Sequence, residues 1–111
     1  MDELQVETLG MRTRAWQFGD AEGAPLVLVH GNVSDSRFWG ELLRGLPEGT
    51  HAVAPDLRGY GETEPLPIDG TRGMRDFADD VWSLCDALGL ARVVLVGHSM
   101  GGAVVQQMTL D

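Results

Sequence analysis

The sequence predicts an α/β fold, a three-layer α/β/α sandwich in which helices cover both faces of a mostly parallel sheet. Three short apolar runs, at residues 25–31, 50–55 and 91–97, have the length and composition of strands that are buried on both faces. Each run is followed by a segment with helical features, and this alternation is typical of parallel strands joined through helices. Two alternating segments at the N-terminus add a predicted antiparallel hairpin.

The hairpin is predicted from polar and apolar residues that alternate over 4–10 ("LQVETLG") and 12–18 ("RTRAWQF"). Its turn is expected near Gly10 and Met11. A connection rich in turn-forming residues, "FGDAEGAP" at 18–25, then leads into the first buried strand.

The first helix is expected over about residues 36–46. Ser34 or Asp35 can cap its N-terminus, since both side chains accept hydrogen bonds from free backbone N–H groups. Gly45 and Pro47 supply the signals that end it.

A longer helix is predicted over about residues 71–88, with Gly89 as its C-terminal stop. Apolar residues recur there at spacings of three and four, which gives one face directed at the core. They are Met74, Phe77, Val81, Leu84 and Leu88. Asp76, Asp79 and Asp80 lie largely off this stripe.

The carboxyl ends of the three apolar runs are expected to meet at one edge of the sheet, where ligands bind in folds of this kind. Those ends are His30-Gly31-Asn32, Pro55-Asp56 and Gly97-His98-Ser99. From Ser99 onward the chain is predicted to be helical.

The segment "VVLVGHSMGGAV", residues 93–104, contains Gly97-x-Ser99-x-Gly101 between a predicted strand and a predicted helix. A strand that passes directly into a helix forces a sharp turn with a strained residue at its tip. The two glycines permit close backbone packing, so the serine hydroxyl is presented clear of the sheet. The N–H groups at the start of the helix favour negative charge at the same place.

Two other interpretations of this segment compete with a nucleophile. The glycines could serve packing alone, with the serine there by chance, but the strand–turn–helix context favours a nucleophile. A phosphate-binding loop is disfavoured, because the chain has no lysine and "GHSMGG" does not fit G-x-G-x-x-G.

Three segments of the chain resemble the α/β-hydrolase family. They are "LVLVHGN" at 26–32, "VAPDLRGYGET" at 53–63 and "VVLVGHSMGGAV" at 93–104, in the family's order and at its spacing. The resemblance spans most of the chain and implies an α/β-hydrolase fold with a serine nucleophile.

The resemblance also implies roles for particular residues. Ser99 would be the nucleophile, and the backbone N–H groups of Met100 and Asn32 would form the oxyanion hole, with Val33 as the neighbouring candidate. Acyl transfer builds an oxyanion, and two preset donors stabilise it.

Further candidates surround this site. Val33, Phe38, Trp39 and His98 are possible substrate-pocket residues, although core packing is the favoured role for the two aromatic residues. His98 points away from its neighbour Ser99 in a tight turn, so it is not expected to be the general base.

The remaining polar candidates are expected to be structural. His30 would shape the oxyanion loop, and His51 would be a surface residue at the opposite end of its strand. Asp56 and Arg58 match the family's D-x-R-G-x-G loop, where a local ion pair or turn-organising role is expected. Thr63 stands where the family often has serine.

The other two members of a catalytic triad have no expected position in this sequence. In this family the acid and then the histidine follow the serine along the chain. The twelve residues after Ser99 include no histidine, and Asp111 is their only acid. Residues 1–111 are therefore expected to be the N-terminal portion of a single hydrolase domain, cut short after the nucleophile helix. The isolated chain is expected to be unstable or to associate through an exposed strand, and to be inactive alone.

The predicted function is that of a serine hydrolase acting on a small carboxylic ester or a related acyl substrate. One alternative is a non-catalytic receptor or scaffold with the hydrolase fold, since fold alone does not determine function. A second is a relative of dehalogenases and epoxide hydrolases, whose family members place aspartate at the position of Ser99 but have a segment similar to "HGN".

Composition limits the partners. The net charge is −9 and all eight basic residues are arginine, which argues against a nucleic-acid partner.

Other composition features concern the interior and the location of the protein. The single cysteine, Cys85, is expected to be buried on its helix. The first residues, "MDELQVETLG", do not have the basic and apolar pattern of a secretory leader, and no apolar run approaches the length of a membrane-spanning helix. A cytoplasmic protein without membrane contact is therefore expected. No spacing typical of metal ligands is present, and the mechanism needs no metal or organic cofactor. The sequence gives no oligomeric state.

Overall fold

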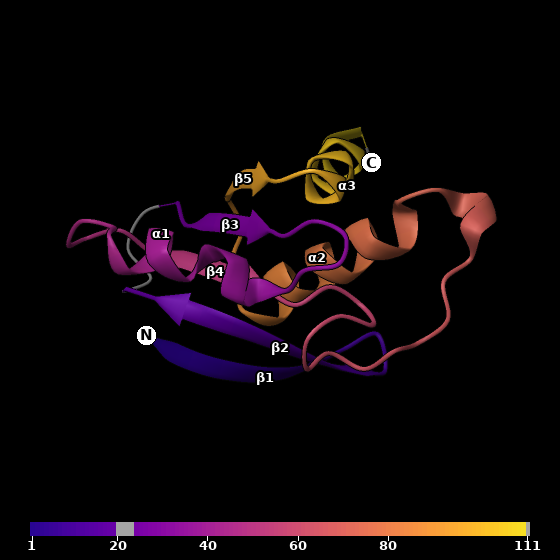
Figure 1. The fold of residues 1–111 in the computed structure, drawn as a ribbon, viewed down its shortest axis with the longest axis horizontal. Coiled ribbons are helices and arrows are strands. Elements are labelled where there is room, and N and C mark those ends of the chain that lie inside the picture. Colours follow the sequence, from indigo (N-terminus) through magenta and orange to yellow (C-terminus); the bar gives the residue numbers. More distant parts are fainter. Residues whose placement is uncertain (20–23, 111) are drawn as a thin grey trace.

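A computed structural model describes residues 1–19 and 24–110 (Figure 1). Part of the predicted turn-rich connection over 18–25 lies outside these residues, and so does Asp111. The described chain forms one five-stranded sheet in the order β1-β2-β4-β3-β5. Its strands are β1 (Asp2–Thr8), β2 (Met11–Phe18), β3 (Leu26–Val29), β4 (Ala52–Pro55) and β5 (Val94–Gly97).

The directions of the strands confirm the predicted α/β class. β3 pairs in parallel with both β4 and β5, whereas β2 is antiparallel to β1 and to β4. Four of the five strands therefore point the same way, and β2 is the exception. The predicted N-terminal hairpin is the β1–β2 pair.

The turn of the hairpin is formed by Leu9 and Gly10, which both have positive φ (51° and 74°). Two successive left-handed residues are typical of the tight turns whose twist matches that of paired strands. The expected turn near Gly10 and Met11 is thus one residue late, because Met11 already pairs with Thr8. Beside the turn, the hydroxyls of Thr8 and Thr13 hydrogen-bond to each other at 2.9 Å.

The first predicted helix is present in two pieces. A 3₁₀ turn, η1 (Ser36–Trp39), is followed by a short helix, α1 (Gly40–Arg44), where a single helix over 36–46 was expected. Gly40, a weak helix former, stands where the geometry changes. Of the two candidate caps, Asp35 is the one used: its carboxylate accepts a hydrogen bond from the Arg37 N–H at 2.9 Å.

The second predicted helix starts later than expected. Helix α2 (Arg75–Ala87) follows a 3₁₀ turn, η2 (Gly70–Arg72), and Gly73 separates the two with φ 64°. The expected apolar face is confirmed for Phe77, Val81 and Leu84, which are all buried.

Two aspartates of α2 are buried. Asp76 and Asp80 lie off the apolar stripe, as expected, and are 6% and 4% exposed. Asp80 is buried against Arg58, whose guanidinium donates two hydrogen bonds to it at 2.9 and 2.8 Å. Burial raises the pKa of Asp80, and Arg58 opposes that rise. Helical periodicity cannot reveal such partners, because they come from other segments.

The position of His51 differs from the prediction. It was expected on the surface but is 4% exposed. Its carbonyl accepts the Leu26 N–H at 2.8 Å, a bond of the ladder in which Leu26 pairs with Ala52. His51 therefore lies immediately before β4 and against β3.

Helices cover both faces of the sheet, as predicted. Alternate residues of β3 and β4 contribute to different clusters: Leu28, Ala52 and Ala54 pack with Trp39 and Leu43 on the α1 side. On the other side α2 and α3 (Met100–Leu110) pack together over β3 (Figure 1). Cys85 is buried in this second cluster, and burial raises the pKa of its thiol to about 11.

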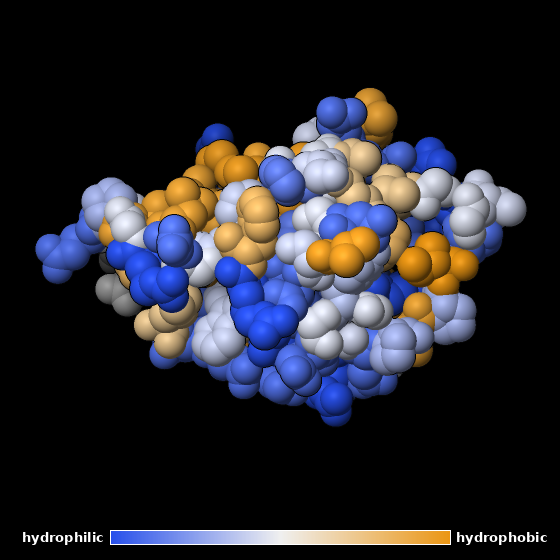
Figure 2. Space-filling model, viewed as in Figure 1, coloured by the Kyte–Doolittle hydropathy of each residue, from blue (hydrophilic) through white to orange (hydrophobic). Residues whose placement is uncertain are grey.

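Strand β5 lies at the edge of the described sheet. Val94 is 48% exposed, and Figure 2 shows apolar surface where β3 and β5 lie. The strand that leads to Ser99 therefore has one neighbour, β3, among the described residues. No described helix is long and apolar enough to cross a membrane.

A buried ion pair joins the hairpin to the loop after β4. Arg14 Nε donates to Asp56 Oδ2 at 2.8 Å, and Asp56 is 1% exposed. Asp56 also accepts the N–H groups of Ser36 and Glu62 at 2.7 and 2.9 Å. Thr63 completes the connection: its hydroxyl donates to the Asp56 carbonyl at 2.8 Å and accepts the Arg14 N–H at 3.0 Å. The expected ion pair around Asp56 is thus made with Arg14, while Arg58 binds Asp80.

Removal of the Asp56 carboxylate should destabilise the fold strongly. Asp56→Ala leaves the buried Arg14 guanidinium with Glu3 alone as its partner and removes the acceptor of the Ser36 and Glu62 N–H groups, so we expect a loss of about 3–5 kcal/mol in the free energy of unfolding. Urea denaturation measures it. Asp79→Ala, which removes a half-exposed partner of Arg72, is the matched control and should leave the midpoint nearly unchanged. Equal midpoints for the two variants would contradict the assigned role.

Candidate active site

The turn between β5 and α3 has the geometry that the glycine spacing predicts. Ser99 lies between the last residue of the strand and the first residue of the helix, with φ 57°. A left-handed conformation is costly for a residue with a side chain and is retained where the surroundings enforce it. The Ser99 side chain is exposed at the tip of this turn.

The surroundings enforce the turn through backbone contacts at two glycines. A Cβ on Gly97 would lie 2.3 Å from the Gly101 carbonyl oxygen, and one on Gly101 would lie 2.0 Å from the Val29 carbonyl oxygen. Both distances are far below any normal contact, so only glycine fits. The helix start is thereby pressed against strands β5 and β3.

The loop that follows β3 lies directly beside this turn. A Cβ on Gly31 would lie 3.0 Å from the His98 carbonyl oxygen and from Ser99 Cβ. Residues 30–33 and Ser99 are therefore neighbours in space, as expected from the meeting of strand ends.

Two backbone N–H groups are candidates to hold an anion beside Ser99. Met100 is the first residue of α3, so its N–H has no acceptor within the helix. In the loop, the Val33 N–H already donates to Asn32 Oδ1 at 3.0 Å. The Asn32 N–H is therefore a better candidate than that of Val33.

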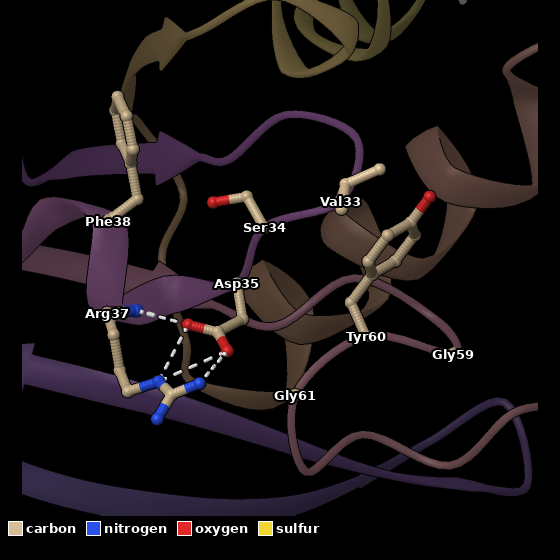
Figure 3. A pocket seen from close by; sticks show the side chains of 8 residues that line it. All are labelled: Val33, Ser34, Asp35, Arg37, Phe38, Gly59, Tyr60 and Gly61. Atoms are coloured by element: carbon tan, nitrogen blue, oxygen red, sulfur yellow. Dashed lines mark hydrogen bonds and ion pairs between the residues drawn. The ribbon is translucent and has the colours of Figure 1, made fainter.

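A small hollow of about 260 Å³ opens at Ser99. It is lined by Gly31, Asn32, Val33, Ser34, Phe38, His98 and Ser99. Within it the Phe38 and His98 rings stack, with centroids 4.5 Å apart and planes at 24°. Three of its residues, Val33, Ser34 and Phe38, also border a wider hollow of about 540 Å³ beside Tyr60 (Figure 3).

The candidate pocket residues differ in position. Val33, Phe38 and His98 line the hollow, and Val33 is 91% exposed. Trp39 does not line it: it is 8% exposed and packs against Leu28 and Leu43 in the core beneath α1. Adjacent residues of a 3₁₀ turn point in different directions, so Phe38 and Trp39 cannot share one role.

None of the three histidines of the chain is placed to accept a proton from Ser99. His30 is fully buried; its Nδ1 donates to the Gly31 carbonyl at 2.8 Å and its Nε2 accepts the Leu57 N–H at 2.9 Å. Burial lowers the pKa of His30, and these two bonds specify the neutral ring. His51 lies at the far end of β4, and the His98 ring stacks on Phe38.

Metal ligands are not clustered in the described part of the chain. No group of three or more histidine, cysteine or carboxylate side chains there could hold a metal ion.

The model of the alpha/beta hydrolase fold family matches residues 24–111. The chain belongs to the α/β-hydrolase family. The fold and the family that the sequence predicted are thereby confirmed.

Individual relatives of this α/β-hydrolase chain differ in their activities. A magnesium-chelatase 30 kDa subunit of Rhodobacter capsulatus is 32% identical over 84% of the chain and 32% of its own length. A soluble epoxide hydrolase of a Corynebacterium species is 38% identical over 80% of the chain and 30% of its own length. The structure of a thermophilic esterase from Thermogutta terrifontis matches with a TM-score of 0.85 and 31% identity, over 100% of the chain and 41% of that protein. The chain thus spans about a third of the length of the curated relatives it matches.

Sequence reasoning missed one residue of the site. Tyr60 lies in the D-x-R-G-x-G loop, and its hydroxyl donates to Asn32 Oδ1. A tyrosine between two glycines in a loop after a strand was the available signal, because a loop exposes such a side chain unless it has a partner. Its partner, 28 residues earlier, could not be found from spacing.

Adding a methyl group at Gly101 should destabilise the hydrolase fold. The Cβ of Gly101→Ala would overlap the Val29 carbonyl, so the helix must move away from β3, at a cost of about 1–3 kcal/mol or more. Thermal or urea unfolding measures the loss. Gly70→Ala is the control, since its added methyl group would have no atom within 4 Å and its φ is not left-handed. A Gly101→Ala variant as stable as Gly70→Ala would disprove the close packing.

His30 should make stability depend on pH. The unfolded ring takes up a proton near pH 6.5, while the buried ring has a lowered pKa. Below about pH 6.5 the unfolded state binds more protons than the folded state. The free energy of unfolding therefore decreases as the pH is lowered, by at most about 1.4 kcal/mol per pH unit for one group. We expect a flatter profile between about pH 7 and 5 for His30→Gln, measured by urea denaturation. The same slope in both proteins would exclude His30 as the source.

Proposed function

We propose that the protein is a serine hydrolase that acts on a small carboxylic ester or a related acyl substrate through an acyl-enzyme. The observation that supports this most is the conformation of Ser99, left-handed and exposed at the tip of a strand–helix turn. The neighbouring N–H groups of Met100 and Asn32 add the anion site that acyl transfer requires. The likeness to an esterase structure supports the same reaction class.

In this proposal Ser99 Oγ attacks the carbonyl carbon of the substrate while its proton passes to a base. The carbonyl π electrons move to oxygen, and the resulting oxyanion accepts hydrogen bonds from the Met100 and Asn32 N–H groups. The dipole of α3 favours the same negative charge. Collapse of the intermediate expels the alcohol, which takes the proton back from the base. Water then attacks the acyl-serine by the same route and frees Ser99.

In this proposal the base and the acid come from residues other than these 111. The geometry of His30, His51 and His98 fits none of them to the task, and no histidine follows Ser99. A serine hydroxyl is a weak nucleophile without such a base. We therefore propose that this chain supplies the nucleophile and the oxyanion donors and is inactive by itself.

The size of the hollow supports a small substrate. Its volume of about 260 Å³ is at the lower end for ligand sites, and the stacked Phe38 and His98 rings form an aromatic wall. Exposed Val33 lies on the opposite loop and would contact the acyl or alcohol group. The proposed setting is the cytoplasm, with no membrane or nucleic-acid partner.

Two alternative functions have some support. A non-catalytic receptor or scaffold remains an alternative, because relatives of the same fold carry names as different as a magnesium-chelatase subunit and an epoxide hydrolase. Similarity to a soluble epoxide hydrolase favours that chemistry, but Ser99 stands where those enzymes are expected to have aspartate. The ester-hydrolase proposal is preferred because the residue at the exposed tip of the turn is serine, beside two candidate N–H donors.

The proposal predicts that the intact protein is labelled at Ser99 by an organophosphonate probe and hydrolyses short-chain p-nitrophenyl esters. Ser99→Ala should remove labelling and lower kcat by several orders of magnitude, since the covalent step is lost. Ser83→Ala, on helix α2, is the matched control and should retain both.

The outcomes separate the alternatives. A protein that folds but is not labelled at Ser99 would favour the receptor or scaffold, and epoxide hydrolysis that survives in Ser99→Ala would contradict a serine nucleophile.

A further inference from the structure

The loop that contains the candidate oxyanion donor is held by a residue from a distant segment, Tyr60. The Tyr60 hydroxyl donates a hydrogen bond to Asn32 Oδ1. Its ring meets the His30 ring edge-on, with centroids 5.3 Å apart. These contacts fall on either side of Gly31, the residue whose backbone abuts Ser99. Tyr60 thus contacts the loop after β3 at two residues, His30 and Asn32, on either side of the glycine that lies against Ser99.

The carboxamide oxygen of Asn32 accepts hydrogen bonds from two donors. Oδ1 accepts the Tyr60 hydroxyl and also the Val33 N–H, the latter at 3.0 Å. Val33 has φ 53°, a conformation that is strained for a β-branched residue and must be enforced by its surroundings. A fixed carboxamide keeps the Val33 N–H occupied and this conformation in place. The two bonds at Oδ1 thus hold Asn32 both by its side chain and through the peptide that follows it, which restrains the residue that carries the candidate N–H.

Tyr60 is itself rigidly placed. Its N–H donates to the Leu57 carbonyl at 2.9 Å and its carbonyl accepts the Thr63 N–H at 3.1 Å. Leu57 in turn donates its N–H to His30 Nε2 at 2.9 Å. Figure 3 shows the ring rising from its loop toward Val33. The loop of residues 56–63 can therefore act as a fixed support for residues 30–33.

We propose that Tyr60 is a positioning residue for the oxyanion site. Its hydroxyl holds the Asn32 side chain so that the Val33 N–H stays bonded and the Asn32 N–H faces the oxygen that develops beside Ser99. Tyr60 touches neither the substrate nor Ser99 in this role. The inference rests on the proposed hydrolase function for its catalytic consequence, but the placement of the loop can be tested without catalysis.

The first test compares Tyr60→Phe with the wild-type intact protein in p-nitrophenyl ester hydrolysis. The variant keeps the ring and its contact with His30 and loses only the hydroxyl. Misplacement of a donor that acts in the transition state should lower kcat by about 10- to 100-fold and leave KM within about twofold. Thr71→Val, which removes an exposed hydroxyl bonded to Asp69, is the control and should have wild-type kcat. An unchanged kcat for Tyr60→Phe would overturn the proposal.

The second test asks whether the hydroxyl acts through Asn32. Asn32→Ala retains the backbone donor but lacks the acceptor of the Tyr60 hydroxyl. The loss caused by Tyr60→Phe should therefore largely disappear in the Asn32→Ala background. Additive losses would show that Tyr60 acts by another route.

The third test is independent of chemistry at Ser99. Amide hydrogen exchange at Val33 should be several-fold faster in Tyr60→Phe than in the wild type, while exchange at core amides of β3 stays unchanged. Unaltered exchange at Val33 would overturn the positioning role. If the wild-type protein hydrolyses no ester, the proposed function fails, and Val33 exchange alone decides the role of Tyr60.

Discussion

The site depends on the close approach of main chain to main chain at three glycines. Gly97, Gly101 and Gly31 lie where strand β5, helix α3 and the loop after β3 meet, and a single methyl group at any of them would meet another residue's atoms at 3.0 Å or less. Because these contacts involve backbone atoms, side-chain rotation cannot relieve them. The left-handed Ser99 and its exposed hydroxyl follow from this packing, as does the position of the loop beside it.

Around this contact the chain uses two layers of polar support. Next to Ser99, the side chains of His30, Asn32 and Tyr60 fix the loop after β3 through bonds to backbone groups or to one another. Farther out, Asp56 binds Arg14 and the N–H groups of two other segments. His30 and Asp56 are the buried members of these layers; His30 is bonded at both ring nitrogens and Asp56 is paired with Arg14, which allows them to lie in a low-dielectric interior.

Much of this arrangement could be predicted from the sequence, because it depends on local patterns. The strand–turn–helix at Ser99 follows from apolar runs and glycine spacing. The first helix was predicted from its capping and stop residues, and α2 was predicted from its apolar periodicity. The errors concern residues whose environment is set by distant partners. The burial of Asp80 and Asp76 was not predicted, because their partners Arg58 and Arg72 lie outside the helix. His51 was wrongly predicted to be a surface residue, because its bond to β3 cannot be found from its place before a strand. Tyr60 was missed for the same reason.

The bond between Arg14 and Asp56 joins residues 42 positions apart. It lies beside the pairing of β2 with β4, and the chain between these two strands contains β3 and α1. The β1–β2 ribbon, closed by a two-residue turn, requires almost no loop-closure entropy, whereas this contact requires the ordering of a long loop first. Folding of the chain should therefore be limited by the docking of a preformed ribbon onto the parallel strands, at the slower pace of topologies rich in non-local contacts.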